Sequence, residues 1–202
     1  SLLVRGAYQN WVRPPAPGTL GPVATAGIPL DERMVSSGGE LKRARVDLEW
    51  EACAKSFMRF YLDQQRVDND PFDIQNFKLP EAESLNRLKE RTFTALAADN
   101  TFEGSIDVSE GKATLAGFGL NQIVTDRISI FGRYRYIDSE NESSSYRGNK
   151  LPYLPKHTYT VGATLVHPLG FSWITRAMHR SIRFSDEQNL TKLKSSWDVS
   201  TD

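Results

Sequence analysis

Residues 43–52, R-A-R-V-D-L-E-W-E-A, alternate between polar and apolar side chains without interruption. The charged side chains share one parity: Arg43, Arg45, Asp47, Glu49 and Glu51. The apolar side chains share the other: Ala44, Val46, Leu48, Trp50 and Ala52. A period of two residues is that of a β-strand with one polar and one apolar face. The stretch therefore predicts a two-faced strand, and it leaves open which face is inside.

The same alternation recurs along the rest of the chain, and with residues 43–52 it gives about eight strands. The other stretches are 2–12, 56–67, 111–122, 126–136, 157–166, 171–180 and 192–201. Short links at 52–56, 122–126 and 166–171 alternate with long ones at 13–39, 68–110, 138–156 and about 183–191. In an antiparallel meander, this alternation places every short turn at one end of the sheet and every long loop at the other. Such sorting is typical of outer-membrane β-barrels.

These features together predict the fold class. We expect an all-β chain, an antiparallel meander of about eight long strands that forms a transmembrane β-barrel or an arc of one, with residues 1–202 in a single domain. Residues 80–100 have leucines at helical spacing among good helix formers, so we expect one short helix inside the longest loop. Strands of roughly 10 to 13 residues, tilted by about 40°, span about 25–33 Å, which matches a bilayer.

Composition excludes several classes of protein. Lys plus Arg and Asp plus Glu balance at 25 each, so nothing in the net charge favours nucleic acid as a partner. No apolar run approaches the length of about 20 residues that a membrane-spanning helix needs. Cys53 is the single cysteine and cannot form an internal disulfide, so the cysteine content does not distinguish an oxidising compartment from a reducing one. The chain opens without a charged and then apolar leader, so we expect a removed signal or an internal fragment.

Within a barrel, the apolar parity faces lipid and the charged parity faces the lumen. The lumen-facing candidates are Arg43, Arg45, Asp47, Glu49, Arg127, Arg133, Arg135 and Arg176. Aromatic residues concentrate near strand ends, where rings form the girdles at the headgroup level: Trp11, Trp50, Tyr134, Tyr136, Tyr153, Trp173 and Trp197. An arginine surplus favours anionic solutes. The alternatives are a solvated polar face that binds nothing, and aromatic residues in the core of a soluble β-protein.

No pattern for catalysis, cofactors or metals is present. His157, His167 and His179 have no partner at ligand spacing, and His157 and His167 lie at opposite ends of one strand, about 30 Å apart. The chain has no nucleophile elbow, phosphate-binding loop, dinucleotide-binding glycine pattern or cysteine pair. We therefore expect no catalytic residues, no cofactor, no bound metal and no enzymatic activity.

The C-terminal half resembles TonB-dependent outer-membrane receptors. The resemblance rests on D-R-I-S-I-F-G-R-Y-R-Y-I-D-S-E at 126–140, a polar loop, and G-N-K-L-P-Y-L-P-K-H at 148–157, and it covers about residues 110–202. The motif positions are Gly148, Leu151, Pro152, Pro155 and His157. Prolines rigidify the descending loop in an extended form before the next strand begins. The family's plug domain and TonB-binding segment are not visible, and its barrel has 22 strands, so we expect a fragment of a larger barrel or a related barrel without energy coupling.

The resemblance implies the leading functional hypothesis. We expect a segment of an outer-membrane barrel of a Gram-negative bacterium that takes up a small solute such as a siderophore, vitamin or glycan. The expected partners are outer-membrane lipid and TonB, and TonB would act through a plug domain absent from this chain. The first alternative is a soluble antiparallel β-sheet that acts as a binding module. The second is an outer-membrane barrel enzyme, for which no catalytic group is recognisable. The orientation of the apolar parity separates the first two hypotheses.

Overall fold

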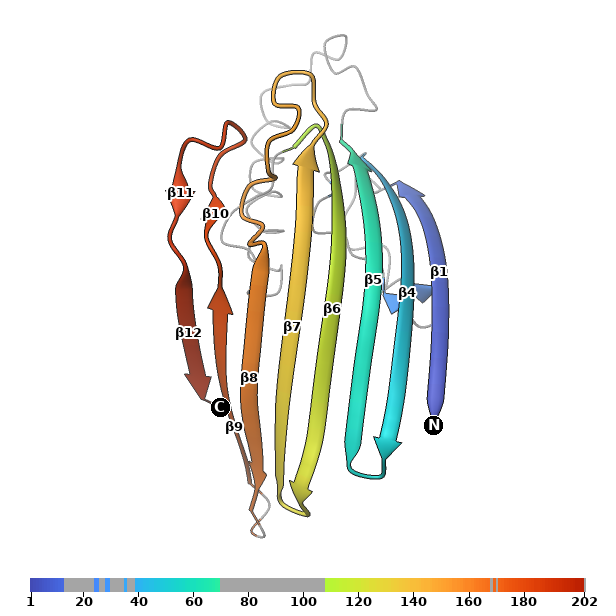
Figure 1. Cartoon of the computed structure of the whole chain (residues 1–202), viewed down its shortest axis with the longest axis vertical. Coiled ribbons are helices and arrows are strands. Elements are labelled where there is room, and N and C mark those ends of the chain that lie inside the picture. Colours follow the sequence, from blue (N-terminus) through green and yellow to red (C-terminus); the bar gives the residue numbers. More distant parts are fainter. Residues whose placement is uncertain are drawn as a thin grey trace, which may run out of the picture.

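The computed structural model describes residues 1–12, 24–25, 28–29, 35, 39–69, 108–167, 169 and 171–201, which form one large antiparallel sheet and two small ladders. Eight strands pair in the order β1-β4-β5-β6-β7-β8-β9-β12, and consecutive strands lie side by side (Figure 1). Their bounds are β1 Leu2–Val12, β4 Glu40–Cys53, β5 Ser56–Asp68, β6 Glu110–Thr125, β7 Ile128–Asn141, β8 His157–Val166, β9 Ser172–Arg180 and β12 Ser196–Thr201. The ladders pair β2 Ala24–Thr25 with β3 Ile28–Pro29, and β10 Arg183–Phe184 with β11 Lys192–Leu193.

The predicted meander of about eight strands is confirmed. The three short turns, which join β4 to β5, β6 to β7 and β8 to β9, lie together at one end of the sheet (Figure 1). We call this the turn end, and the opposite end the loop end. The predicted strand 192–201 is divided into β11 and β12. The helix predicted at 80–100 lies outside the described residues.

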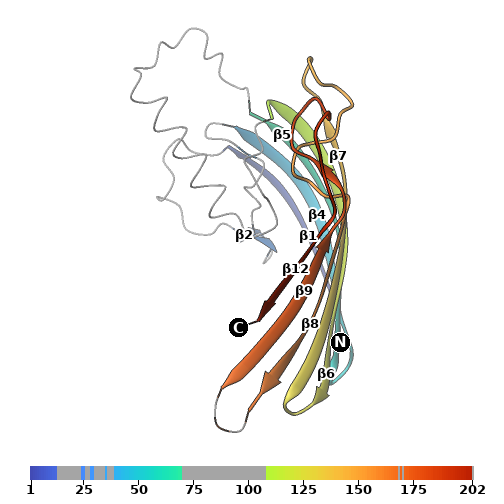
Figure 2. The same cartoon turned by 90° about the vertical axis from the view of Figure 1, so that its left-hand side faces the viewer.

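The sheet curves but does not close. Figure 2 shows β1 and β12 bending to the same side of β6, and these two edge strands do not pair with each other. Antiparallel long strands, strong curvature and two open edges are the features of an arc of a barrel. Of the two predicted forms, a closed barrel and an arc of one, the described residues adopt the arc.

Exposure of the two faces is the reverse of that in a soluble sheet. Residues paired across strands share a face, and the register places Val46, Leu62 and Ala116 on the same one. We call it the apolar face, and its side chains are open: Val46 is 52% exposed and Trp50 45%. On the other side, which we call the ionic face, Asp47 is fully buried and Arg43 is 3% exposed. Large apolar side chains therefore cover the outside, and charged side chains are packed within the fold.

The small hydrophobic core lies on the ionic face near the loop end. It is made of Val35, Leu41, Val67, Val108, Ala113, Leu115, Ile137, Leu151 and Leu154. Leu41 and Val67 share the parity of Arg43, so the charged parity becomes apolar where the loops pack against it. Trp11 packs against this core as well. Its predicted place in an aromatic girdle is therefore wrong, because its parity directs it to the ionic face.

Two glycines accept aromatic rings on the ionic face. Gly117 is paired with Tyr61, and a Cβ at Gly117 would lie only 2.1 Å from the Tyr61 ring. Gly162 is paired with Phe131, and a Cβ there would lie 2.4 Å from that ring. A ring that lies flat over a glycine on the neighbouring strand replaces the missing side chain and shields the backbone. These pairs fix the register at the centre of a strongly bent sheet.

Candidate functional site

A ladder of ion pairs crosses β1, β4 and β5 on the ionic face. At its buried end, Arg43 Nε donates to both carboxylate oxygens of Asp63 at 3.0 and 2.9 Å. Arg45 bridges two carboxylates, with Nη1 at 3.2 Å from Asp63 and Nη2 at 2.9 Å from Asp47. Asp47 also accepts from Arg59, whose Nη2 lies 3.2 Å away. Every carboxylate buried here contacts two guanidinium groups, which offsets the cost of removing it from water.

The ladder continues towards the turn end with more exposed pairs. Arg5 Nη2 donates to Glu49 at 3.0 Å, where both side chains are about one-third exposed. Arg45 also lies over the Tyr61 ring, with its guanidinium carbon 4.2 Å from the ring centre. Counting from the register, the ionic face of these three strands carries four arginines and four carboxylates: Arg5, Arg43, Arg45, Arg59, Asp47, Glu49, Glu51 and Asp63. This part of the face is therefore charge-balanced.

The far side of the same face has a different balance. The ionic face of β7, β8, β9 and β12 carries four arginines, Arg133, Arg135, Arg176 and Arg180, and the single carboxylate Asp198. Arg180 Nη1 contacts Asp198. Arg176 Nε donates to Ser200 Oγ at 2.8 Å. Between the two sides, β6 contributes only small or uncharged residues to this face. This side is therefore cationic.

The eight candidates from the sequence occupy three places. Arg43, Arg45, Asp47 and Glu49 come together in the ion ladder. Arg133, Arg135 and Arg176 lie on the cationic side of the same face. Arg127 lies in the short turn between β6 and β7, so it belongs to neither face. The sequence pattern placed Arg127 in a strand because this turn residue has the same parity as Ser129 and Arg133 in β7.

The loop that carries the family motif folds back along β7. Its carbonyl oxygens continue the pairing of β7, since Asn141 N donates to Asn149 O at 2.8 Å and Ile137 N to Lys156 O at 2.9 Å. Gly148 has φ of +89°, a conformation that favours glycine. The remaining motif residues are placed by packing: Leu151 and Pro155 are buried, and Pro152 lies between them in sequence.

Leu151 makes a third close contact with a glycine, Gly111. A Cβ at Gly111 would lie 3.0 Å from the Leu151 side chain, so the leucine fits against a strand residue without a side chain. The motif loop therefore acts as a cap on the hydrophobic core. His157 ends the loop, and its Nδ1 is 2.9 Å from the Tyr134 hydroxyl.

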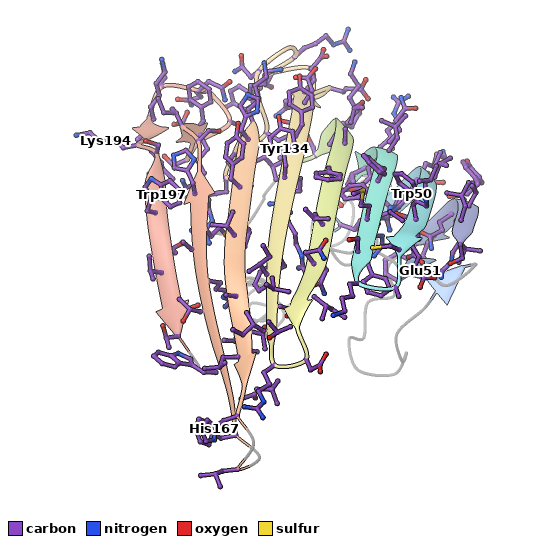
Figure 3. The ribbon with its side chains drawn as sticks, turned by 60° about the horizontal axis from the view of Figure 1, so that its bottom comes forward. Trp50, Glu51, Tyr134, His167, Lys194 and Trp197 are labelled. Atoms are coloured by element: carbon purple, nitrogen blue, oxygen red, sulfur yellow. The ribbon has the colours of Figure 1, made fainter. Side chains whose placement is uncertain are left out.

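Aromatic rings form a continuous row on the apolar face near the loop end. Ring centres are 5.0 Å apart for Tyr134 and Tyr159, 6.0 Å for Tyr159 and His179, and 4.9 Å for His179 and Trp197. The row crosses β7, β8, β9 and β12, and Figure 3 shows Tyr134 and Trp197 far from His167 at the tip of the β8–β9 turn. At the turn end, Trp50 and Trp173 are 45% and 51% exposed. Aromatic residues thus border the apolar face at both ends.

The described residues contain no group of three or more His, Cys, Asp or Glu side chains that could hold a metal ion. His157, His167 and His179 instead take part in ring contacts. Cys53 is exposed at the end of β4. No helix within the described part of the chain is both long and apolar enough to cross a membrane.

Comparisons with known proteins give matches only among solved structures, since no protein-family profile and no curated protein sequence matches the chain. The siderophore receptor PiuA from Acinetobacter baumannii is similar over 99% of this chain and 27% of its own length, with a TM-score of 0.59 and 16% identity. The ferric preacinetobactin receptor BauA from the same organism is similar over 99% of this chain and 26% of its own length, with a TM-score of 0.57 and 10% identity.

The ferric yersiniabactin uptake receptor FyuA from Yersinia pestis is similar over 99% of this chain and 26% of its own length, with a TM-score of 0.53 and 14% identity. The chain therefore spans about a quarter of the length of each of these receptors. At such low identities the likeness concerns the fold. The resemblance to TonB-dependent receptors that residues 126–157 predicted is confirmed at that level, and the chain has the fold of an arc of a TonB-dependent siderophore-receptor barrel.

Proposed function

We propose that this chain is part of an outer-membrane β-barrel receptor of a Gram-negative bacterium that takes up a small, siderophore-like solute. The observation that carries the proposal is the reversed exposure of the two faces. A sheet that exposes Val46, Trp50 and Ile130 while burying Asp47 and Asp63 is unstable as a soluble module but suited to a lipid boundary. The fold shared with three siderophore receptors supports the same reading.

The dimensions of the apolar face support a membrane-spanning position. Along β9, Trp173 near the turn end and His179 in the aromatic row are six residues apart, which corresponds to about 20 Å along the strand. Adding the side chains at both ends gives a band close to the roughly 25 Å that barrels present to lipid. The short turns then face the periplasm, and the long loops face the cell exterior.

In this proposal the ionic face lines the interior of the complete barrel, and the loops at the loop end receive the solute. Energy for uptake would come from TonB through a plug domain elsewhere in the full-length protein. The proposal includes no catalytic step. The soluble binding module remains the alternative, but it requires a partner that covers the whole apolar face.

Uptake of radiolabelled iron complexes by cells tests the proposal. A strain that lacks its own siderophore receptors, but expresses the full-length protein, should accumulate at least one ferric siderophore. Accumulation should disappear in the same strain without TonB. Uptake that is unchanged without TonB, or absent for every class of ferric siderophore despite the protein's presence in the outer membrane, would contradict the proposal.

A further inference from the structure

We propose that two loops at the loop end of the sheet move as one rigid body, and that the side chain of Asn189 joins them. They are the β7–β8 loop, residues 142–156, and the β9–β12 loop, residues 181–195, which contains β10 and β11 (Figure 1). The inference goes beyond the proposed function, because it concerns how the loops move and not which solute is taken up. It implies that neither loop can close over a solute independently of the other.

Two amide side chains connect the loops directly. Asn189 pairs with both backbone groups of Lys150, since its Oδ1 accepts from Lys150 N at 2.7 Å and its Nδ2 donates to Lys150 O at 2.8 Å. Asn149 Nδ2 donates to the backbone oxygen of Glu187 at 2.8 Å. The Asn189 side chain thus takes the place that a residue of a neighbouring strand would have in an antiparallel ladder. These contacts join the outer parts of the two loops.

Backbone hydrogen bonds join the loops closer to the sheet as well. Tyr153 N donates to Phe184 O at 2.7 Å. At the base, where β8 begins and β9 has just ended, Ser181 N donates to His157 O at 2.9 Å, and His157 N donates to Ser181 Oγ at 3.0 Å. Contacts at three levels mean that a hinge motion of one loop away from the other would break several hydrogen bonds at once.

The backbone at these contacts is held in an uncommon conformation. Asn189 and Tyr153 both have φ of 59°, and among the described residues they are the only two other than glycine with positive φ. The Asp186 carboxylate holds the turn around Asn189 by accepting from Leu190 N at 2.9 Å and Thr191 N at 2.7 Å. A conformation of this kind persists where the surroundings determine it, and such sites are often functional. The turn is therefore formed in a way that presents Asn189 to the other loop.

The β7–β8 loop attaches the pair of loops to the sheet. Leu151 and Leu154 belong to the hydrophobic core, and Lys150 Nζ lies 2.7 Å from Asp138 of β7. None of the described residues in 181–195 belongs to that core. The β9–β12 loop is therefore held in place largely through its contacts with the β7–β8 loop, so a change at Asn189 should be felt in both.

Hydrogen exchange of the full-length protein in phospholipid nanodiscs, followed by mass spectrometry, tests the inference. Asn189→Asp keeps the size of the side chain and its tolerance for positive φ, but it replaces the donor that faces the Lys150 carbonyl by an acceptor. We expect the amides of Lys150 and Tyr153, which lie in the other loop, to exchange about tenfold faster in this variant, because local opening then breaks fewer hydrogen bonds.

Gln188→Glu is the matched control. It makes the same change from amide to acid at the adjacent residue, whose side chain is exposed, and we expect it to leave the exchange of Lys150 and Tyr153 as in the parent protein. Asn189→Gly is a second variant, which keeps the backbone conformation and removes all side-chain hydrogen bonds, and it should act as Asn189→Asp does. Unchanged exchange in both Asn189 variants, or equal acceleration by Gln188→Glu, would overturn the role of Asn189.

Pulsed electron paramagnetic resonance tests the rigid-body motion without any change at Asn189. Spin labels at Ser145→Cys and Leu190→Cys, two exposed positions on different loops, would be introduced with Cys53 replaced by serine. We expect one narrow distribution of distances, which stays the same when a ferric tris-catecholate or a ferric tris-hydroxamate complex is added. Two distances, or a shift on addition of either complex, would show that the loops move separately. Neither measurement requires uptake, so a failure of the inference leaves the proposed function standing, and the reverse.

Discussion

Replacing Asp63 by asparagine tests whether the buried end of the ion ladder depends on a full negative charge. Asp63 is 1% exposed and accepts hydrogen bonds from Arg43 and, at 3.2 Å, from Arg45 Nη1. The substitution keeps the shape of the side chain and removes its charge. Arg43, which is 3% exposed, then loses its ion pair with Asp63, whereas Arg45 keeps its pair with Asp47.

The expected loss of stability is large. Removing one partner of a buried ion pair costs about 3–5 kcal/mol, because the other charge is left uncompensated. We expect the lower part of this range, about 3 kcal/mol, since Arg45 keeps Asp47 and Arg43 keeps its hydrogen bond to Gln9. The matched control is Glu49→Gln, which breaks the Arg5–Glu49 pair, where the side chains are 31% and 34% exposed. A pair of that exposure contributes only about 0–1 kcal/mol.

The assay is reversible unfolding of the full-length protein in phospholipid vesicles by guanidinium chloride, followed by tryptophan fluorescence. A lower midpoint with an unchanged slope reports the loss of stability. A double variant, Arg43→Met with Asp63→Leu, should be more stable than the sum of the two single effects predicts, because neither charge remains unpaired. A cost of less than about 1 kcal/mol for Asp63→Asn, or one equal to that of Glu49→Gln, would show that the buried end of the ladder does not depend on the charge of Asp63.

Two further predictions concern a glycine contact and a loop carboxylate. Gly117→Ala should destabilise the sheet by about 1–3 kcal/mol in the same unfolding assay, because the new Cβ meets the Tyr61 ring. The loss of stability should be smaller when Gly117→Ala is introduced into a protein that already carries Tyr61→Ala. Equal losses in the two backgrounds would contradict the contact. In the β10–β11 loop, hydrogen bonds from the backbone N–H groups of Leu190 at 2.9 Å and Thr191 at 2.7 Å lower the pKa of the Asp186 carboxyl. The resulting stabilisation of the folded protein is present above the unfolded pKa of about 3.9 and is lost as pH falls through the lower pKa of the folded state. NMR can follow the titration of the Asp186 carboxyl. A midpoint above that of an unfolded peptide would contradict the lowered pKa.

Strand periodicity and loop sorting predicted most of the large sheet. The bounds of β1 and β8 agree with the alternating stretches, and the three short turns were found from the links between them. Alternation is a reliable signal here because each strand separates two chemically distinct environments along its whole length. The parity of residues 43–52 also assigned the correct side chains to each face, although it did not by itself say which face is buried.

Other features required three-dimensional information. The apolar core near the loop end was missed, because Leu41 and Val67 interrupt a charged parity without breaking the strand. The charge asymmetry of the ionic face was missed for a different reason. Counting arginines along the sequence gives a surplus, but only the cross-strand register shows how the arginines and carboxylates of the strands divide between the two sides of this face. Arg127 was placed on a face by parity, whereas it lies in a turn.

Site-directed spin labelling can determine whether the apolar face lies against lipid. Single cysteines at Val46 and Val161 on the apolar face, and at Arg45 and Thr160 on the ionic face, would be introduced after replacing the exposed Cys53 by serine. In vesicles, labels at Val46 and Val161 should collide readily with oxygen, which dissolves in lipid, and rarely with a water-soluble nickel complex. Labels at Arg45 and Thr160 should not show this lipid signature. Nickel accessibility at Val46 and Val161 as high as in a water-exposed turn would show that the apolar face does not lie against lipid.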